Sequence, residues 1–457
     1  MSQSSITSED SHDRAGVNKP LSPTPAARFI CFLRDRPYTI VTIVTLTTMG
    51  IFAVAKKGSA WNQVYVGASQ SLLHGRNLYR DVPNYTYPPF SAWAGIPFVI
   101  LPARIARGLW YVICAAATVY LIRKAWQLAA GPMLETDGRR AAARPREQAA
   151  FLIGIAFALQ FALNALTHLQ TDLLIGALLM AGCAALLAGQ FYRSAAWLGL
   201  AAAFKATPLL FAPYLLWRRR WAAAGLLVCI AVGANLLPDT VHSPPGGGLW
   251  LTQWTRLYLA PMGKANYLPG DWQNQLNNNQ SIAGAVRRWM GTSWDSSHSR
   301  PDAPAPASIR RAFYVGCALV MLPVLWLAWR RRRLAGEAFD PSNARPDAAD
   351  RFPSATAIEC GIALLLMLLL SPNSSRAHFC IAFLPAFCIA RLTLLRSGAA
   401  LRVLLALAVL LSTLSIHIRL PWSYDAEQLL LWLGVITLAT LFLLLACILA
   451  LTGKNAA

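Results

Sequence analysis

The chain has 457 residues, of which 56% are hydrophobic and only 13% are charged, and its mean hydropathy is +0.43. A composition this apolar excludes one or two soluble domains and is typical of a membrane protein with many spans. The formal net charge of +21 does not indicate nucleic-acid binding, because the basic residues stand in short clusters at the ends of apolar runs, where membrane topology explains them.

The polar residues 1–27 lack the apolar core and the cleavage signal of a secretory leader. Residues 1–36 are therefore predicted to form a disordered cytoplasmic tail. Residues 37–457 are predicted to form one all-α, polytopic transmembrane domain, with its first span at Pro37 to Ala55.

A polar, aromatic-rich segment follows the first span, and we expect this loop, residues 56–88, to lie outside the membrane. Val64, Ala68 and Leu72 share one face of a helix. This spacing predicts an amphipathic helix that lies in the membrane interface and ends near Gly75.

Two arginine clusters determine the direction of the later spans. Arg218 to Arg220 and Arg330 to Arg333 each adjoin an apolar run, so both are predicted to be cytoplasmic. One span leaves the cytoplasm between them and another returns, which places residues 239–311 outside as a second, larger loop. The same alternation places Ser371 to His378 outside, and Arg391 to Arg402 inside together with the C-terminus.

The first half of the chain allows two solutions. If Phe90 to Leu101 and Ala195 to Trp217 are separate spans, the count is twelve, but the Arg-rich loop Arg123 to Glu147 then lies outside, against the positive-inside expectation. If Phe90 to Ile122 crosses once in net, and Ala195 to Trp217 is a re-entrant pair broken at Thr207-Pro208, that loop is cytoplasmic and the count is about ten. Both solutions keep the two external loops outside.

Polar residues in apolar surroundings are the first candidates for a binding site. Lys205 stands near the centre of the apolar stretch 195–217, where a charge costs roughly 2.5–3.5 kcal/mol on insertion scales. It must face a wet or anionic cavity, or snorkel beside a broken helix. His168 and Asp172 lie between two apolar runs, where they either serve a function or belong to a short loop capped by Thr171.

Two further candidate segments fall at the external ends of spans. Asn274 to Ser281 is rich in amides, which suit sugar hydroxyls, and it precedes a helix whose N-terminus can attract phosphate. In Ser371 to Phe379, Arg376 can pair with a phosphate, and His378 can hydrogen-bond a phosphate or a hydroxyl. The competing interpretations are a disordered loop with a helix cap for the first segment, and capping with interfacial anchoring for the second.

The signals of soluble enzymes are missing from the sequence. It contains no glycine-rich nucleotide loop of standard spacing, no Cys/His metal cluster and no G-x-S-x-G elbow. We therefore predict no cofactor and no metal. The nine cysteines lie mostly inside apolar runs, so no disulfide framework is predicted.

Together these segments resemble glycosyltransferase family 87, the polyprenyl-phosphate-dependent C-type glycosyltransferases of bacterial envelopes. The matching residues are Trp61 to Tyr65, Leu72 to Tyr79, Tyr85 to Pro89, Lys205 with Thr207-Pro208, Asn279 to Ser281, and Ser371 to Phe379. The resemblance implies a GT-C fold in the bacterial inner membrane with a site that faces the periplasm. It implies inverting transfer of mannose or arabinofuranose from a polyprenyl phosphate to a lipid- or glycan-linked acceptor. The donor contacts that it implies are Tyr65, Tyr87, His168, Lys205, Asn279, Gln280, Ser281, Arg376 and His378.

One position departs from the family pattern. The pattern places its presumed catalytic aspartate, the general base, directly before Trp61, and here that residue is Ala60. Loss of a general base is expected to lower the rate by about 10²–10⁴-fold. The chain is then an engineered inactive variant, a natural degenerate member, or an enzyme with a shifted base such as Asp81. The intact remainder of the loop favours the first two.

A transporter or flippase of polyprenyl-linked sugars is the competing function, because its site would also be cationic and rich in amides. Such a protein is expected to show an inverted repeat in its hydropathy pattern, and the sequence shows none. A membrane scaffold would leave Lys205 and the external amides unexplained. The sequence therefore predicts the transferase.

Overall fold

The computed structural model describes residues 37–55, 61–132, 145–263, 268–269, 276–291, 306–335, 352–396, 398–416 and 423–452. Within these ranges the regular secondary structure is all helical, which confirms the expected class. Six of the described helices are long and apolar enough to cross a membrane. The predicted total of ten to twelve spans stays a prediction, and the predicted tail, residues 1–36, lies outside the described residues.

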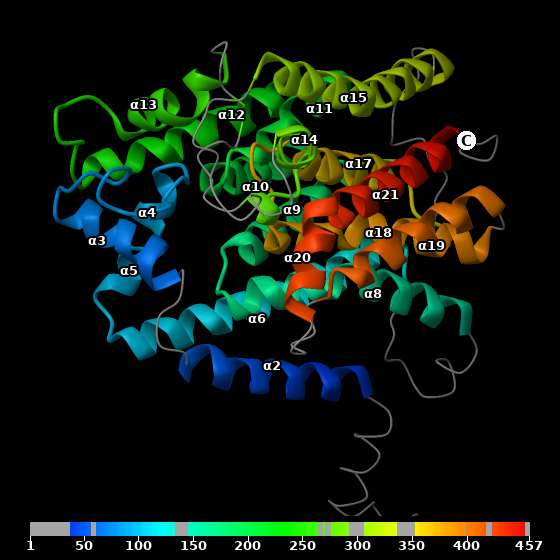
Figure 1. Ribbon diagram of the computed structural model, residues 1–457, viewed down its shortest axis with the longest axis horizontal. Helices are drawn as coiled ribbons and strands as arrows, with labels where there is room; N and C mark the ends of the chain where they lie inside the picture. Colours follow the sequence, from blue (N-terminus) through cyan, green and yellow to red (C-terminus); the bar gives the residue numbers. More distant parts are fainter. Residues whose placement is uncertain are drawn as a thin grey trace, which may run out of the picture.

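Long helices form a bundle, and short helices gather at one end of it, where α3, α4, α5 and α13 lie in Figure 1. Eleven of the helices are α8 (Pro145–Thr167), α9 (Asp172–Leu187), α12 (Trp221–Leu236), α13 (Trp250–Trp254), α14 (Ile282–Gly291), α15 (Ala307–Ala335), α17 (Ala355–Leu369), α18 (Phe383–Leu395), α19 (Ala399–Leu414), α20 (Ser423–Leu433) and α21 (Val435–Thr452), and the bounds of the others are given below.

The first helix and the amphipathic helix form where the sequence predicts them. The first helix, α2, covers Pro37–Ala55. A π-helical turn, Trp61–Val66, continues into α3 (Gly67–Leu73), which buries Ala68 and Leu72. Gly75 follows with φ +64°, a left-handed conformation that glycine adopts without strain and that commonly ends a helix.

The span expected at Phe90 to Leu101 in the twelve-span solution is wrong. This stretch forms two short helices, α4 (Phe90–Ala94) and α5 (Ile96–Val99). At 1.5 Å per residue, helices of this length cover less than about a third of a 30 Å hydrocarbon layer. The next helix, α6 (Ala103–Leu128), is long and apolar enough to cross a membrane, which agrees with the single net crossing of the ten-span solution.

The segment after α9 turns back on itself instead of crossing. Helix α10 (Phe191–Phe204) breaks, a 3-10 turn (Thr207–Leu210) follows, and α11 (Phe211–Trp217) leads away from the break. Both ends of the segment lie together, because the guanidinium of Arg220 stacks on the ring of Phe191 at 3.9 Å from its centroid. The segment makes no net crossing, which agrees with the re-entrant alternative.

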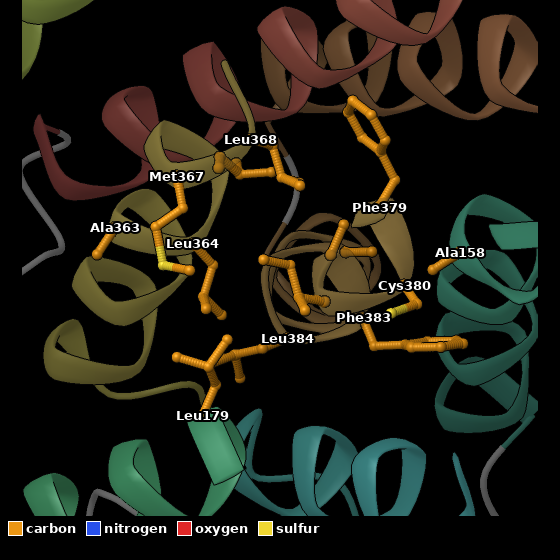
Figure 2. Close-up of a cluster of buried hydrophobic side chains, with 14 of the residues drawn as sticks. Ala158, Leu179, Ala363, Leu364, Met367, Leu368, Phe379, Cys380, Phe383 and Leu384 are labelled. Carbon is orange, nitrogen blue, oxygen red and sulfur yellow. The ribbon is translucent and has the colours of Figure 1, made fainter. Parts of the chain in front are cut away.

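The core of the bundle is built around α18. The apolar segment that contains it, Arg376–Leu395, is 89% buried within the protein, far more than the other five candidate spans. Figure 2 shows Phe379, Phe383 and Leu384 packed among side chains of α8, α9 and α17. A close-packed surrounding of this kind holds the turn before α18 in one position.

A buried ion pair joins α18 to α8 at the end of α18 far from residue 376. Arg391 is 1% exposed, and its Nε and Nη2 atoms each donate to a carboxylate oxygen of Glu147 at 2.8 Å. Its Nη1 atom donates to the carbonyl of Ala129 at 2.6 Å. The ends of the loops predicted to be cytoplasmic, Arg123 to Glu147 and Arg391 to Arg402, therefore lie at the same end of the bundle.

Breaking this pair is expected to destabilise the fold. Glu147→Ala leaves the Arg391 charge buried without its carboxylate, which costs about 3–5 kcal/mol in free energy of unfolding. Thermal unfolding of the purified protein in detergent measures the change. The double variant Glu147→Leu/Arg391→Met should unfold closer to the parent, because no charge is left buried. A single variant as stable as the parent would contradict this role.

Candidate active site

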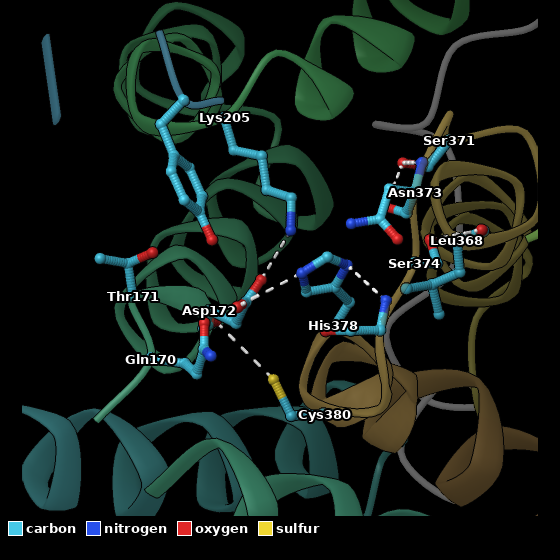
Figure 3. Close-up of polar contacts among 12 residues, drawn as sticks. Gln170, Thr171, Asp172, Lys205, Leu368, Ser371, Asn373, Ser374, His378 and Cys380 are labelled. Carbon is cyan, nitrogen blue, oxygen red and sulfur yellow. Dashed lines mark hydrogen bonds and ion pairs between the residues drawn. The ribbon is translucent and has the colours of Figure 1, made fainter. Parts of the chain in front are cut away.

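A small cavity lies at the end of the bundle where α9 begins, α10 breaks and the chain enters α18. We call it the narrow cavity, since its volume of about 20 Å³ has room for roughly one water molecule. Its lining residues are Asp172, Ile175, Leu179, Lys205, Thr207, Met367, Leu368, Ser371, Ser374, His378 and Ile381. The polar members come from three segments that are far apart in the sequence (Figure 3).

Asp172 is the centre of the polar group. It opens α9, where the helix dipole favours a negative charge, and it is 3% exposed. Its Oδ1 atom accepts a hydrogen bond from Lys205 Nζ at 2.9 Å. Its Oδ2 atom lies 3.7 Å from His378 Nε2, too far for a hydrogen bond, and has no hydrogen-bond partner among the described residues. Oδ1 of Asp172 is thus hydrogen-bonded to Lys205, and Oδ2 has no hydrogen bond from a described residue.

Lys205 stands at the break in α10, and the break has a local cause. Pro208 has no N–H for the carbonyl of Phe204, four residues earlier, so the helix cannot continue. The hydroxyl of Ser91 donates to that carbonyl instead, at 3.0 Å. The Asn235 side chain donates to the preceding carbonyl, that of residue 203, at 3.3 Å. The freed carbonyls are therefore satisfied, and the lysine can leave the helix axis toward Asp172.

His378 is oriented by its own turn. The backbone N–H of Ser375 donates to His378 Nδ1 at 3.2 Å, in a capping box at the start of the 3-10 turn Arg376–Ala382. Because Nδ1 accepts this bond, the proton of the neutral imidazole is on Nε2. The Nε2–H group therefore faces the Oδ2 side of Asp172.

Two tyrosines of the first loop reach the same region. The hydroxyl groups of Tyr65 and Tyr87 are 2.6 Å apart, and Thr171 Oγ1 donates to the Tyr65 hydroxyl at 3.3 Å. Burial raises the pKa of both tyrosines well above the ordinary value, so both stay neutral. Tyr65 thus contacts Thr171, the residue directly before Asp172, and Tyr87 bonds to Tyr65.

Trp61 connects the first loop to the same turn by a second route. Its ring stacks on that of Trp110 with centroids 6.0 Å apart. Trp110 Nε1 in turn donates to the carbonyl of Leu169 at 2.9 Å. Trp61, which follows the position of the expected aspartate, is therefore connected through Trp110 to the turn just before Asp172.

The two positions predicted for the base differ in what can be said of them. Ala60 lies outside the described residues. Asp81 is well exposed, and it accepts from the backbone N–H of Asn77 at 2.9 Å and lies 3.8 Å from Arg80 Nε. These contacts close a local turn in the first loop, and Asp81 lines neither cavity of this site.

A second cavity, of about 340 Å³, adjoins the narrow one, and we call it the wide cavity. Its lining residues are Asn164, His168, Gln170, Asn277, Asn278, Ser375, Arg376, Ala377, Tyr424, Glu427, Gln428 and Leu431. Arg376 and His168 are thus apart from Lys205 and His378, although the sequence grouped all four as donor contacts. Arg376 forms an ion pair with Glu427.

The amide element of the second loop, Asn279 to Ser281, is buried and bonded within the protein. Asn279 donates to the carbonyl of Pro372 at 2.9 Å and accepts from the N–H of Ser374 at 3.0 Å. Gln280 Nε2 donates to the carbonyl of Leu431 at 2.8 Å. These bonds position the loop before His378, while contact between these amides and a sugar stays a prediction.

Asp172 is the residue that sequence reasoning undervalued. Its signal was present, since an acid between two apolar runs is costly unless it is paired or used. The pattern alone gave a capped loop as the slightly better interpretation. The side chain of Thr171, the expected cap, instead bonds to Tyr65.

Comparisons with known proteins identify the family of the chain. A family model described as Glycosyltransferase family 87 matches residues 85–342, more than half of the chain. No curated protein sequence matches the chain. A solved structure, the crystal structure of ArnT from Cupriavidus metallidurans bound to undecaprenyl phosphate, is similar over 91% of this chain and 77% of that one, at 15% identity and a TM-score of 0.36.

Proposed function

Because this chain belongs to glycosyltransferase family 87, we propose that it transfers a sugar of the mannose or arabinofuranose class from a polyprenyl phosphate to a lipid- or glycan-linked acceptor. The transfer takes place at the periplasmic face of a bacterial inner membrane and inverts the anomeric carbon. The observation that carries the proposal is the buried group of Asp172, Lys205 and His378, in which an ammonium, an imidazole N–H and an unbonded carboxylate oxygen line one cavity.

Lys205 and His378 hold the leaving phosphate, and the narrow cavity must widen to admit it, because it has room for only about one water molecule in this structure. A positive charge and an N–H donor in a buried cavity stabilise the charge that develops on a departing phosphate better than water does.

The acceptor hydroxyl gives its proton to Asp172. The acceptor oxygen forms a bond to the anomeric carbon, the bond from that carbon to the phosphate oxygen breaks, and its electron pair leaves with the phosphate. The released proton goes to Oδ2 of Asp172, the oxygen that Lys205 does not hold. This role makes Asp172 the shifted base, in place of the missing carboxylate at Ala60.

Position 60 provides the test of this assignment. The parent protein in lipid nanodiscs, given polyprenyl-phospho-mannose or polyprenyl-phospho-arabinofuranose and an alkyl glycoside acceptor, should transfer the sugar. Ala60→Asp should change the initial rate by less than about tenfold, because a base is already present. An inactive parent that Ala60→Asp activates by about 10²-fold or more would place the base at position 60 and reject Asp172.

A further inference from the structure

The wide cavity and the narrow cavity are lined by neighbouring residues of the same two segments, and no residue lines both. Gln170 lines the wide cavity, and Asp172, two residues later, lines the narrow one. On the turn that leads into α18, Arg376 lines the wide cavity and His378, two residues later, lines the narrow one. On both segments, the residue that lines the wide cavity is thus only two positions along the chain from Asp172 or His378.

The chemistry of the wide cavity differs from that of the narrow one. Its two charged groups neutralise each other, since Arg376 pairs with Glu427 and also donates to the carbonyl of Ser415. The other polar lining groups are mostly amides and hydroxyls, which both donate and accept hydrogen bonds. Such a lining favours a neutral ligand with many hydroxyl groups over a phosphate.

One lining residue points to a ligand independently. Asn277 is 4% exposed, and its Nδ2 atom donates to Gln428 Oε1 at 3.3 Å. Its Oδ1 atom is buried and has no hydrogen-bond partner among the described residues. A buried acceptor without a donor costs about 1–3 kcal/mol, so a hydroxyl supplied by a ligand would be favourable there.

We propose that the wide cavity is a sugar subsite, in which Asn277 and Gln428 hydrogen-bond the hydroxyl groups of one sugar ring. The volume of about 340 Å³ lies at the lower end of the range for small-molecule pockets, which suits a single ring. Tyr424 adds an aromatic surface to the lining. The proposal rests on the proposed function, because the ring is either the sugar being transferred or the sugar that receives it.

Binding of the donor, with and without its sugar, tests whether the wide cavity holds the sugar being transferred. The probes are polyprenyl phosphate and its mannose and arabinofuranose derivatives, and the variants are Asn277→Ala and Gln428→Ala. Asn277→Ala keeps the backbone carbonyl that accepts from Gln280 at 2.7 Å, so the loop should still fold. If the cavity holds the transferred sugar, affinity for a sugar-bearing donor falls about three- to tenfold, while affinity for polyprenyl phosphate stays the same.

Transfer to octyl mannoside or octyl arabinofuranoside tests whether the wide cavity holds the sugar that receives the transferred one. If the cavity holds the receiving sugar, both donor affinities stay the same and the KM for the acceptor rises about three- to tenfold. Gln190→Ala is the matched control, because Gln190 is exposed and directly precedes α10, at the end away from Lys205. It should change neither the donor affinities nor the KM for the acceptor. Unchanged donor affinity and unchanged acceptor KM in both folded variants would overturn the subsite. A parent that binds no polyprenyl phosphate would instead reject the proposed function.

Discussion

Asp172→Asn is expected to lower the rate of sugar transfer by about 10²–10⁴-fold, because an amide cannot take a proton from the acceptor hydroxyl. The substitution keeps the size of the side chain and an oxygen that can accept from Lys205. Initial rates at saturating donor measure the loss. Affinity for polyprenyl phosphate should not fall, since removing a negative charge beside Lys205 does not weaken the attraction of that ammonium for phosphate.

Asp81→Asn is the matched control for this variant, since it makes the same chemical change at an exposed position of the first loop. It should keep the rate of the parent. A large loss in Asp81→Asn together with an unaffected Asp172→Asn would exchange the two assignments and return the base to the first loop.

Lys205→Met is expected to lower transfer by about 10²–10³-fold and also to weaken donor binding. The methionine side chain has a similar length but provides neither the charge nor the hydrogen bond for the leaving phosphate. It also leaves Asp172 buried without its ion-pair partner, so part of the loss could come from misfolding. Binding of polyprenyl phosphate and thermal unfolding are measured together to separate these effects.

The double variant Lys205→Met/Asp172→Asn separates loss of catalysis from loss of folding. It removes both charges at once, so thermal stability should return toward that of the parent while transfer stays low. Lys124→Met, at a partly exposed lysine of α6, controls for the loss of a positive charge elsewhere in the bundle. A double variant that is stable and also active would show that the pair only supports the fold.

Features with a local cause could be predicted from the sequence. The run from Pro37 to Ala55 is uncharged and mostly apolar, and the helix has the same bounds. Pro208 predicts a break, and the break is found just before it, at Lys205. Composition was a weaker guide between Phe90 and Leu101, because an apolar stretch does not by itself reveal that the chain forms two short helices.

Features that depend on contacts between distant residues could not be predicted. Asp172 in α9 pairs with Lys205 at the end of α10, and Arg376 pairs with Glu427 in α20. No local sequence pattern encodes either pair. The amides of Asn279 and Gln280 had the composition of a sugar site but bond to the loop at residues 372–374 and to α20. Local patterns identified which residues were unusual, and only the tertiary contacts show what each one faces.

The pair of Asp172 and Lys205 also bears on how the chain is made. The two residues are 33 positions apart, at the start of α9 and the end of α10, so they leave the ribosome as parts of one helical hairpin. An ammonium that enters a membrane beside a carboxylate is neutralised at once, which lowers the cost of inserting that hairpin. His378 is synthesised much later, with α18. The ion pair of Asp172 and Lys205 is therefore complete early in synthesis, and His378, the second residue proposed to hold the phosphate, is added only when most of the bundle has been made.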